Sequence, residues 1–372
     1  MLTIVTSSFP LRQDGSEAAG SFVADLAEEL SSNTSVCVVA PGTSESRDIY
    51  RSIEVFRYRA PARPLSTLRL WHPQDLRIVF DVMSSGMKMT RAAATGASGI
   101  LACWGLPCGY WAKVAAKENS IPYSTWLLGS DVWTLGRIPL IKGMLARVIQ
   151  GASNVYADGF ALAAEAAKIS GKDIAFLPST RKFGGWQSEK RRSQAPFRFL
   201  FLGRWHRNKG IDLLLEALEL LNDDDWSGID TFEIQGGGPL ESLVRSRVNV
   251  LESRGRAVKL GAFLSKDEAE KAIANSDWVV IPSRIESIPV IFSDAMKMSR
   301  PVVATPVGDL PRLMREWGCG IECRSTEPQD IAHGLREAIC SKRFPDISPN
   351  LKEIFSLSEI ARRVLDDLAV QG

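Results

Sequence analysis

The stretch FRFLFLGRWHRNKGIDLLLEALELL (197–221) decides the fold. Its first seven residues, FRFLFLG, form a β-rich run that ends in a glycine. The stretch GIDLLLEALELL (210–221) begins seven residues after that glycine and carries apolar residues at helical spacing. A buried strand, a short polar loop and an amphipathic helix make up half of a βαβ unit, so this stretch predicts a parallel sheet.

The same alternation of strand and helix continues to about residue 320. Four further β-rich runs follow, each separated from the next by an amphipathic helical pattern: TFEIQGG (231–237), AVKLGAF (257–263), WVVIPS (278–283) and PVVATP (301–306). The pattern predicts an α/β domain with a doubly wound parallel sheet and helices on both faces. Ligands of such sheets bind at the carboxyl ends of the strands. We therefore expect the binding rim at 203–210, 236–239 and 283–289.

The first half of the chain repeats this pattern, so a second Rossmann-like domain is expected. Its predicted strands are LTIVTS (2–7), SVCVVAP (35–41), IEVFRYR (53–59), GILACW (99–104), YSTWLLG (123–129) and SNVYAD (153–158). A chain of 372 residues is also too long for one ordinary core. The charged segment SEKRRSQAP (188–196), which ends in proline, is typical of a linker. We expect one domain over 1–187 and a second over 188–350.

Composition excludes several classes of function. The net charge is only +2, and no segment shows the basic stripe with interleaved aromatic residues that nucleic-acid binding requires. The six cysteines lack CxxC spacing and there are three histidines, so buried free thiols are expected and neither a metal site nor a cofactor is. The amino terminus has no signal-peptide pattern, and no uncharged apolar run reaches a membrane-spanning length. A cytoplasmic protein is expected.

Two cations lie close to the first rim segment. In GRWHRNKG, Arg204 follows the strand and Lys209 lies at the predicted start of the next helix, where the helix dipole also favours an anion. A bidentate guanidinium and a point charge together would neutralise a diphosphate group. Two exposed surface cations remain the alternative reading of this segment.

A pair of carboxylates marks the third rim segment, PSRIESIPVIFSDAM. Glu286 ends a loop after a strand, Pro289 is suited to the first helical position, and Asp294 lies eight positions after Glu286. Carboxylates in this arrangement bind the vicinal hydroxyls of sugars, although helix capping and solvation also explain such pairs. In the second segment, the turn from Gly236 to Pro239 permits a tight strand-to-helix connection and a close approach of the backbone.

The order of these elements resembles glycosyltransferase family 4, the retaining enzymes of GT-B fold that are also called glycosyl transferases group 1. That family shows a GR-x-K-G stretch, a G-x-G-P turn, two acids separated by seven residues, and PVVAT. The corresponding segments here are GRWHRNKG, GGGP, Glu286 with Asp294, and PVVATPVG. The match is close over about 203–320 and looser upstream, in SSFPLRQDGSEAAG, LACWGLP and LLGSDVW. The tail, 351–372, resembles the family's terminal helix, which crosses back to the first domain.

The resemblance implies a role for each matched residue. Arg204 and Lys209 would bind the donor diphosphate, Glu286 the sugar hydroxyls and Asp294 the ribose. Gly15 or Gly20 would bring backbone N–H groups near the phosphates from the first domain. The remaining donor-binding positions implied by the motifs are Gly203, Gly237, Gly238, Ser287, Ile288 and Pro289.

Three positions depart from the family pattern. Leu128 stands where a histidine commonly contacts the transferred sugar, Asp294 replaces a glutamate, and Asp309 replaces a glycine after PVVAT. A leucine facing the sugar would leave a 6-hydroxyl unpaired, which favours a 6-deoxy sugar or a pentose as donor. The alternative is that Leu128 belongs to the core and that Ser130 or Asp131 makes the sugar contact.

The resemblance implies transfer of a sugar from a nucleotide-diphosphate sugar, the co-substrate, to a glycan or lipid-linked acceptor, as in surface polysaccharide biosynthesis. Front-face attack needs no metal and no side-chain base, and Asp131 is only a candidate base. Peripheral contact with the inner face of the cell membrane stays open, with 68–87 as the best segment. A non-catalytic protein that binds nucleotide sugar remains the alternative function.

Overall fold

The computed structural model describes residues 1–12, 20–61, 72–184, 191–341, 345, 347–348 and 350–369. Contacts between Cα atoms divide the chain into two units, 1–182 with 357–372, and 183–356. The expected domain boundary at 187/188 lies outside the described residues. We refer to the first as the N-terminal unit and to the second as the C-terminal unit.

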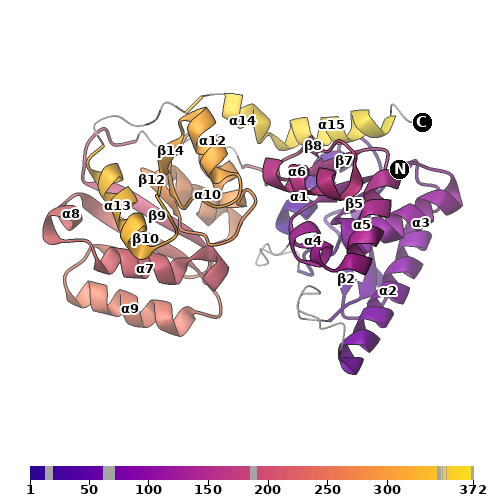
Figure 1. Ribbon diagram of the computed structural model, residues 1–372, viewed down its shortest axis with the longest axis horizontal. Helices are drawn as coiled ribbons and strands as arrows, with labels where there is room; N and C mark the ends of the chain where they lie inside the picture. Colours follow the sequence, from indigo (N-terminus) through magenta and orange to yellow (C-terminus); the bar gives the residue numbers. More distant parts are fainter. Residues whose placement is uncertain are drawn as a thin grey trace. The chain divides into compact units, whose positions relative to one another are not determined.

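An eight-stranded sheet forms the centre of the N-terminal unit (Figure 1). Its strands are β1 (Leu2–Val5), β2 (Val36–Gly42), β3 (Ser46–Tyr50), β4 (Ile53–Arg59), β5 (Gly99–Cys103), β6 (Tyr123–Leu127), β7 (Val155–Ala157) and β8 (Ala175–Phe176). They lie in the order β3-β4-β2-β1-β5-β6-β7-β8, and only β3 runs antiparallel to its neighbour, β4. The predicted doubly wound parallel sheet is confirmed, with one antiparallel edge strand that the sequence did not predict, where a tight turn at Arg51 and Ser52 returns the chain.

Helices cover both faces of this sheet, because neighbouring residues of its buried strands point to opposite sides. In β2, Cys37 and Val39 join one core cluster, whereas Val38 and Ala40 join another. The helices of this unit are α1 (Ser21–Ser31), α2 (Pro73–Ala94), α3 (Tyr110–Asn119), α4 (Ser130–Trp133), α5 (Pro139–Gly151), α6 (Phe160–Ser170) and α15 (Leu357–Ala369). The first cluster takes side chains from α2, α3, α5 and α6, and the second from α1 and α15.

A six-stranded, fully parallel sheet forms the centre of the C-terminal unit, as the sequence predicts. The strands are β9 (Phe197–Arg204), β10 (Ile229–Gly237), β11 (Val258–Leu260), β12 (Trp278–Ile281), β13 (Val302–Ala304) and β14 (Gly320–Glu322), in the order β11-β10-β9-β12-β13-β14. The helices are α7 (Ile211–Glu219), α8 (Asp223–Ser227), α9 (Glu241–Ser253), α10 (Lys266–Asn275), α11 (Val290–Lys297), α12 (Leu310–Trp317), α13 (Pro328–Ile339) and α14 (Asn350–Ile354).

Several local expectations need correction. Cys340 is exposed, whereas the other five cysteines are buried free thiols as predicted. Pro289 was expected to begin the helix, but it is the residue just before α11, because its ψ of 140° is that of extended backbone. Among the described residues, no helix combines the length and the apolar character needed to cross a bilayer.

Candidate functional site

The carboxyl ends of the strands of the C-terminal unit bring together two residues that are 77 positions apart in the sequence. Lys209 ends a single 3₁₀ turn, Arg207–Lys209, which follows β9 and precedes α7. Glu286 lies in the loop between β12 and α11. The Lys209 Nζ donates a short hydrogen bond to Glu286 Oε1. One cation and one carboxylate of the predicted set thus meet at the rim, where they form an ion pair with each other.

A second ion pair ties the same two loops together. Arg284 donates to both carboxylate oxygens of Asp212, at 2.7 and 2.8 Å. The Arg284 backbone N–H also donates to the carbonyl of Asn208 at 2.8 Å. Burial by itself raises the pKa of Asp212, but the hydrogen bonds and charge of Arg284 outweigh it, so this pKa lies below its ordinary value. These contacts fix the loop that carries Lys209 against the loop that carries Glu286.

Sequence reasoning missed this clamp of Arg284 and Asp212. Two signals were available, because Arg284 follows the buried run WVVIPS and Asp212 stands in the first turn of α7. Both positions lie at the carboxyl ends of neighbouring strands, β12 and β9. The rule that placed Lys209 and Glu286 at one rim therefore applies to this pair as well.

Glycines let the rim loops approach one another closely. Gly210 has φ 68°, and a Cβ there would lie 1.7 Å from the carbonyl oxygen of Pro282. Gly308 has φ 57°, and a Cβ there would lie 2.1 Å from the carbonyl oxygen of Glu286. Each glycine therefore allows a backbone contact that brings one rim loop onto another.

The three glycines of the turn after β10 differ in how much room they leave for a side chain. A Cβ at Gly236 would lie 2.0 Å from the carbonyl oxygen of Gly203, and one at Gly238 would lie 2.8 Å from that of Trp205. The predicted close approach is thus to the backbone of the neighbouring strand. At Gly237 the nearest atom to such a Cβ belongs to Phe263, at 4.0 Å, which is an ordinary van der Waals contact, so this position has room for a methyl group. Helix α9 begins at Glu241, which is later than the expected start at Pro239.

The other predicted residues of the C-terminal unit differ in exposure. Arg204 is exposed at the end of β9. Ile288 and Pro289 are buried beside Glu286, and the hydroxyl of Ser287 is buried with no hydrogen-bond partner among the described residues. Asp294 is 1% exposed and lies 3.5 Å from the ammonium group of Lys297. The carboxylate of Asp294 is therefore already occupied by a cation on its own helix.

The predicted residues of the N-terminal unit differ in their surroundings where the structure describes them. Gly15 lies outside the described residues. Gly20 precedes α1 with φ 76°, and a Cβ there would lie 2.4 Å from the backbone of Ser8. Leu128 is partly buried against the core cluster that includes β1 and α1, which favours its reading as a core residue.

Asp131, the candidate base, is wholly buried. One oxygen of its carboxylate accepts the backbone N–H of Gly105 at 2.6 Å, and the other accepts that of Val132 at 3.1 Å. Burial raises the pKa of Asp131, and these backbone hydrogen bonds offset part of that rise. The arrangement holds the turn after β5 against α4, so a role in positioning fits Asp131 better than direct proton transfer.

The described residues include no group of three or more His, Cys, Asp or Glu side chains that could hold a metal ion. The protein groups that this rim offers to a ligand are cations, carboxylates, hydroxyls and backbone groups. Such a set suits a phosphorylated, hydroxyl-rich molecule.

Comparisons with known proteins give a family match within the C-terminal unit. Residues 196–341 match the family described as glycosyl transferases group 1. A curated relative, the putative teichuronic acid biosynthesis glycosyltransferase TuaC of Bacillus subtilis, is 27% identical over 229 residues, which are 58% of this chain and 54% of the relative. The chain therefore spans about half the length of this relative.

Solved structures show the fold. HepE of Anabaena in complex with UDP has a TM-score of 0.71 at 14% identity and covers 99% of both chains. A UDP-forming trehalose-phosphate synthase of Burkholderia xenovorans has a TM-score of 0.72 at 11% identity, over 100% of this chain and 99% of its own. Two Rossmann-like units of the GT-B fold, as the sequence predicts, are thereby established.

Proposed function

Because the chain belongs, through residues 196–341, to the glycosyl transferases group 1 family, we propose that it transfers a sugar from a nucleotide-diphosphate sugar to a glycan or lipid-linked acceptor. The observation that carries the proposal is the meeting of Lys209 and Glu286 at the carboxyl rim of the parallel sheet. A diphosphate needs cations and a sugar needs hydroxyl acceptors, and this rim supplies both.

In the proposed complex with a donor, Lys209 and Glu286 exchange their bond to each other for bonds to the donor. When a donor binds, its phosphate oxygens replace Glu286 as partners of Lys209, and the freed carboxylate accepts hydrogen bonds from the sugar hydroxyls. Arg204, which is exposed at the end of β9, supplies the second cation. Asp294 binds the ribose once its contact with Lys297 opens.

The proposed reaction retains the configuration of the sugar. The bond between the anomeric carbon and the diphosphate breaks while the acceptor hydroxyl attacks from the same side. The proton of that hydroxyl passes to the departing phosphate, so no side-chain base is required. Arg204 and Lys209 lower the barrier by neutralising the charge that develops on the leaving group.

Two names among the compared proteins support a carbohydrate role. HepE is solved with UDP-glucose as well as with UDP, and TuaC is named for teichuronic acid biosynthesis. By analogy, we propose a bacterial surface polysaccharide as the product and the cytoplasm, at the inner face of the cell membrane, as the place of reaction. The proposed chemistry asks for no metal, so EDTA should leave turnover unchanged.

The test is a thermal-shift and hydrolysis screen against a panel of nucleotide sugars, with Arg204→Ala and Glu286→Ala beside the native chain. One donor should stabilise the native protein and be slowly hydrolysed, and each substitution should lower that hydrolysis by roughly a hundredfold. Matched controls are Arg245→Ala and Glu241→Ala, which remove an exposed ion pair on α9 in the same unit. If no nucleotide stabilises the protein, the assignment of the donor site is wrong.

The non-catalytic alternative rests on Leu128 and Asp309, which stand where the family commonly shows other residues. Both functions require Asp294 to rearrange before it contacts the ribose, because its carboxylate is buried beside Lys297. A protein that binds nucleotide sugar without turning it over would show stabilisation by one donor but no hydrolysis and no transfer to any acceptor glycan. The screen separates the two functions by that outcome.

A further inference from the structure

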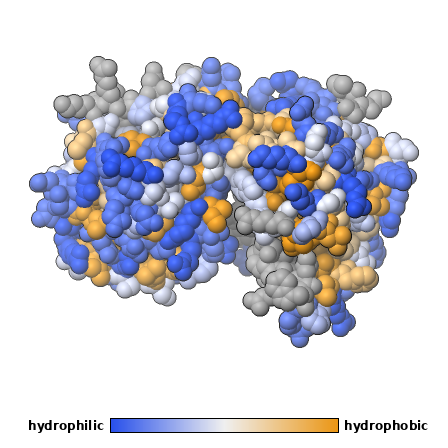
Figure 2. Space-filling model, viewed as in Figure 1, coloured by the Kyte–Doolittle hydropathy of each residue, from blue (hydrophilic) through white to orange (hydrophobic). Residues whose placement is uncertain are grey.

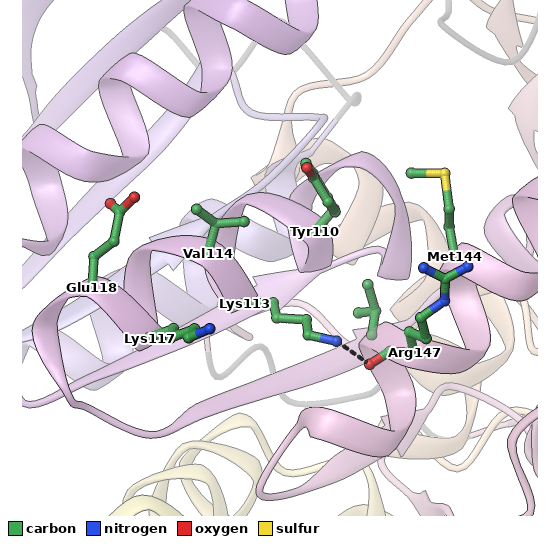
Figure 3. A pocket seen from close by; sticks show the side chains of 8 residues that line it. Tyr110, Lys113, Val114, Lys117, Glu118, Met144 and Arg147 are labelled. Atoms are coloured by element: carbon green, nitrogen blue, oxygen red, sulfur yellow. Dashed lines mark hydrogen bonds between the residues drawn. The ribbon is translucent and has the colours of Figure 1, made fainter.

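The N-terminal unit carries a groove between α3 and α5, which we call the α3–α5 groove. Its volume is about 520 Å³, which falls within the range of about 300–1,000 Å³ that small-molecule sites occupy. Three cationic side chains line it, Lys113, Lys117 and Arg147 (Figure 3). The Lys113 Nζ donates to the backbone carbonyl of Arg147 at 2.7 Å, which ties the two helices together and holds one cation in place along the groove.

The positive charge of this groove is uncompensated. Glu118 is the one carboxylate among its lining residues, and Arg91 of α2 donates to both of its oxygens, at 2.8 and 2.5 Å. The side chains of Lys117 and Arg147 form no hydrogen bond or ion pair with any residue that the structure describes. A guanidinium without a partner is suited to bidentate contact with a carboxylate or a phosphate. The groove therefore offers a site for an anion.

The floor of the groove is apolar. Val114 and Met144 are half-buried and Val148 is buried, so hydrocarbon lies between the cations. Tyr110, at the start of α3, adds a half-buried phenol ring. Figure 2 shows that apolar surface gathers over the region of α4 and α5 on this unit. Apolar and aromatic side chains with a few fixed polar groups are typical of a site for a small organic molecule, so an anion with a carbon skeleton fits better than an inorganic one.

The cations of the groove lie away from the edge of the sheet at which transfer is expected. Helix α3 ends at Asn119 and β6 begins at Tyr123, and α5 ends at Gly151 and β7 begins at Val155. The carboxyl ends of both helices therefore lie where these two parallel strands begin. Lys117 and Arg147 belong to the second halves of their helices. The groove is thus distinct from the carboxyl rim of the strands, where ligands of such sheets react.

We propose that the α3–α5 groove binds an anionic saccharide, one that carries carboxylate or phosphate groups, through a part of the molecule that does not react. Arg147 and Lys117 pair with the anionic groups, and the carbon faces of the sugar rings pack on Val114 and Met144. The inference deepens the proposed function, on which the choice of a saccharide rests, by adding a second contact with the glycan and by assigning that glycan a negative charge.

The test is isothermal titration calorimetry of the full chain with three probes of matched length. Tetragalacturonate carries sugar rings and carboxylates, maltotetraose carries the rings alone, and tetraglutamate carries the carboxylates alone. The native chain should bind tetragalacturonate about tenfold or more tightly than either of the others, and this binding should weaken as salt is raised. Maltose 1-phosphate is a fourth probe, and tighter binding of it than of maltose would identify phosphate as an accepted anion.

Substitutions assign the binding to the groove. Lys117→Gln combined with Arg147→Gln should weaken binding of tetragalacturonate by roughly tenfold to a hundredfold. Both side chains are exposed, so the fold should be unaffected. Arg147→Lys should cause a smaller loss, because a lysine keeps the charge without the bidentate geometry. A matched control removes two exposed lysines from the C-terminal unit, Lys259→Gln with Lys271→Gln, and should bind the probe as the native chain does.

Several outcomes would overturn the proposal: no binding of either anionic saccharide, equal binding of maltotetraose or tetraglutamate, an unchanged affinity in the doubly substituted groove variant, or an equal loss in the control. A failure of the donor site is recognised separately. The groove variant should keep the thermal shift given by nucleotide donors, and Glu286→Ala should keep its affinity for tetragalacturonate.

Discussion

At the scale of single residues, the bond between Lys209 and Glu286 makes a prediction about ligand binding. Lys209→Ala should weaken binding of a nucleoside diphosphate by roughly tenfold to a hundredfold, because a charge-assisted hydrogen bond is lost. Glu286→Gln should leave that affinity equal or slightly higher, since it releases Lys209 from a competing carboxylate. Isothermal titration calorimetry with UDP and ADP measures both effects.

Glu286→Gln should affect turnover of the donor differently from binding of the diphosphate. Glu286→Gln should lower hydrolysis of the donor even though it leaves diphosphate binding intact, because the sugar loses a carboxylate partner. Arg245→Ala and Glu241→Gln, on the exposed face of α9, serve as controls that change charge without touching the rim. A large loss of diphosphate affinity in Glu286→Gln would contradict the competition between carboxylate and phosphate.

The clamp of Arg284 and Asp212 predicts a dependence of stability on pH. Its partners are 28% and 12% exposed, so Arg284→Ala should lower the free energy of unfolding by about 1–2 kcal/mol at pH 7. The pKa of Asp212 is lowered in the folded state, so the stabilisation is present above about pH 4, the ordinary value of an unfolded aspartate. It is lost as the pH falls through the folded value.

Urea denaturation of the native chain and of Arg284→Ala between pH 7 and pH 3 checks this prediction. The difference in unfolding free energy between them should become smaller toward the acidic end, and the hydrogen bond from Arg284 to the carbonyl of Arg207, at 2.6 Å, accounts for a part that does not change with pH. Arg284→Lys should recover part of the stability at pH 7, because a lysine restores the charge without the bidentate geometry. A difference that stays constant over the whole range would show that Asp212 does not titrate with the clamp.

At the scale of elements, the rim loops contain glycines whose neighbours leave no room for a side chain. Gly210→Ala should lower the free energy of unfolding by about 2–4 kcal/mol, because a positive φ is combined with a clash against the carbonyl of Pro282. Gly96 also has a positive φ but no atom within 4 Å, so Gly96→Ala should cost only about 1 kcal/mol. Thermal or urea denaturation of the two variants separates the cost of a positive φ from the cost of a steric clash.

Gly237→Ala provides the matched control at the rim itself, since a Cβ there meets its nearest neighbour at 4.0 Å. Its fold should be nearly unchanged. Because this position has room for a methyl group and belongs to the predicted donor site, Gly237→Ala should weaken nucleotide binding more than it lowers stability. Equal losses of stability in Gly210→Ala and Gly237→Ala would contradict the close contact of the loops.

The turn after β5 depends on Asp131 in a similar way. Asp131→Ala should lower the free energy of unfolding by about 1–3 kcal/mol, because the buried N–H of Gly105 loses its acceptor, whereas the N–H of Val132 keeps the carbonyl of Gly129 at 3.1 Å. Asp131→Asn should cost less, since an amide oxygen still accepts one of these bonds. Denaturation measures the stability, and a donor hydrolysis assay of Asp131→Asn separates positioning from proton transfer. Abolished hydrolysis in a fully stable Asp131→Asn would support the base instead.

The sequence predicted the elements with long apolar runs and missed the short polar ones. Strands β2, β4 and β9 stand where apolar periodicity placed them. The antiparallel edge strand β3 has the sequence SRDIY, four of whose residues are exposed, so it carries no signature of burial. Strands β8 and β14 are two and three residues long and are held by their neighbours in the sheet rather than by their own composition.

The candidate site shows the same limit. Strand ends and glycines could be read from the chain, which is why Lys209 and Glu286 were expected at one rim. Which side chain bonds to which depends on distances across the sheet, and no sequence pattern gives these distances. For that reason the bond between Lys209 and Glu286, the clamp of Arg284 and Asp212, and the contact of Asp294 with Lys297 appear only in the structure.

At the scale of the whole molecule, the last part of the chain contributes buried residues first to the C-terminal unit and then to the N-terminal unit. Phe355 is fully buried in the C-terminal unit, where its ring lies against those of Phe292 and Trp317. Helix α15 belongs to the N-terminal unit, where it packs on α1. Val364 of this helix is fully buried, and Asp367 accepts a hydrogen bond from the Tyr156 hydroxyl at 2.6 Å.

Two substitutions nine positions apart should therefore destabilise different units. Phe355→Ala should cost the C-terminal unit about 3–5 kcal/mol, and Val364→Ala should cost the N-terminal unit about 2 kcal/mol, because each empties a buried site. Hydrogen exchange followed by mass spectrometry reports protection unit by unit. Phe355→Ala should speed exchange in α11 and α12, and Val364→Ala in α1. Faster exchange throughout the chain in both variants would show that the two units unfold as one.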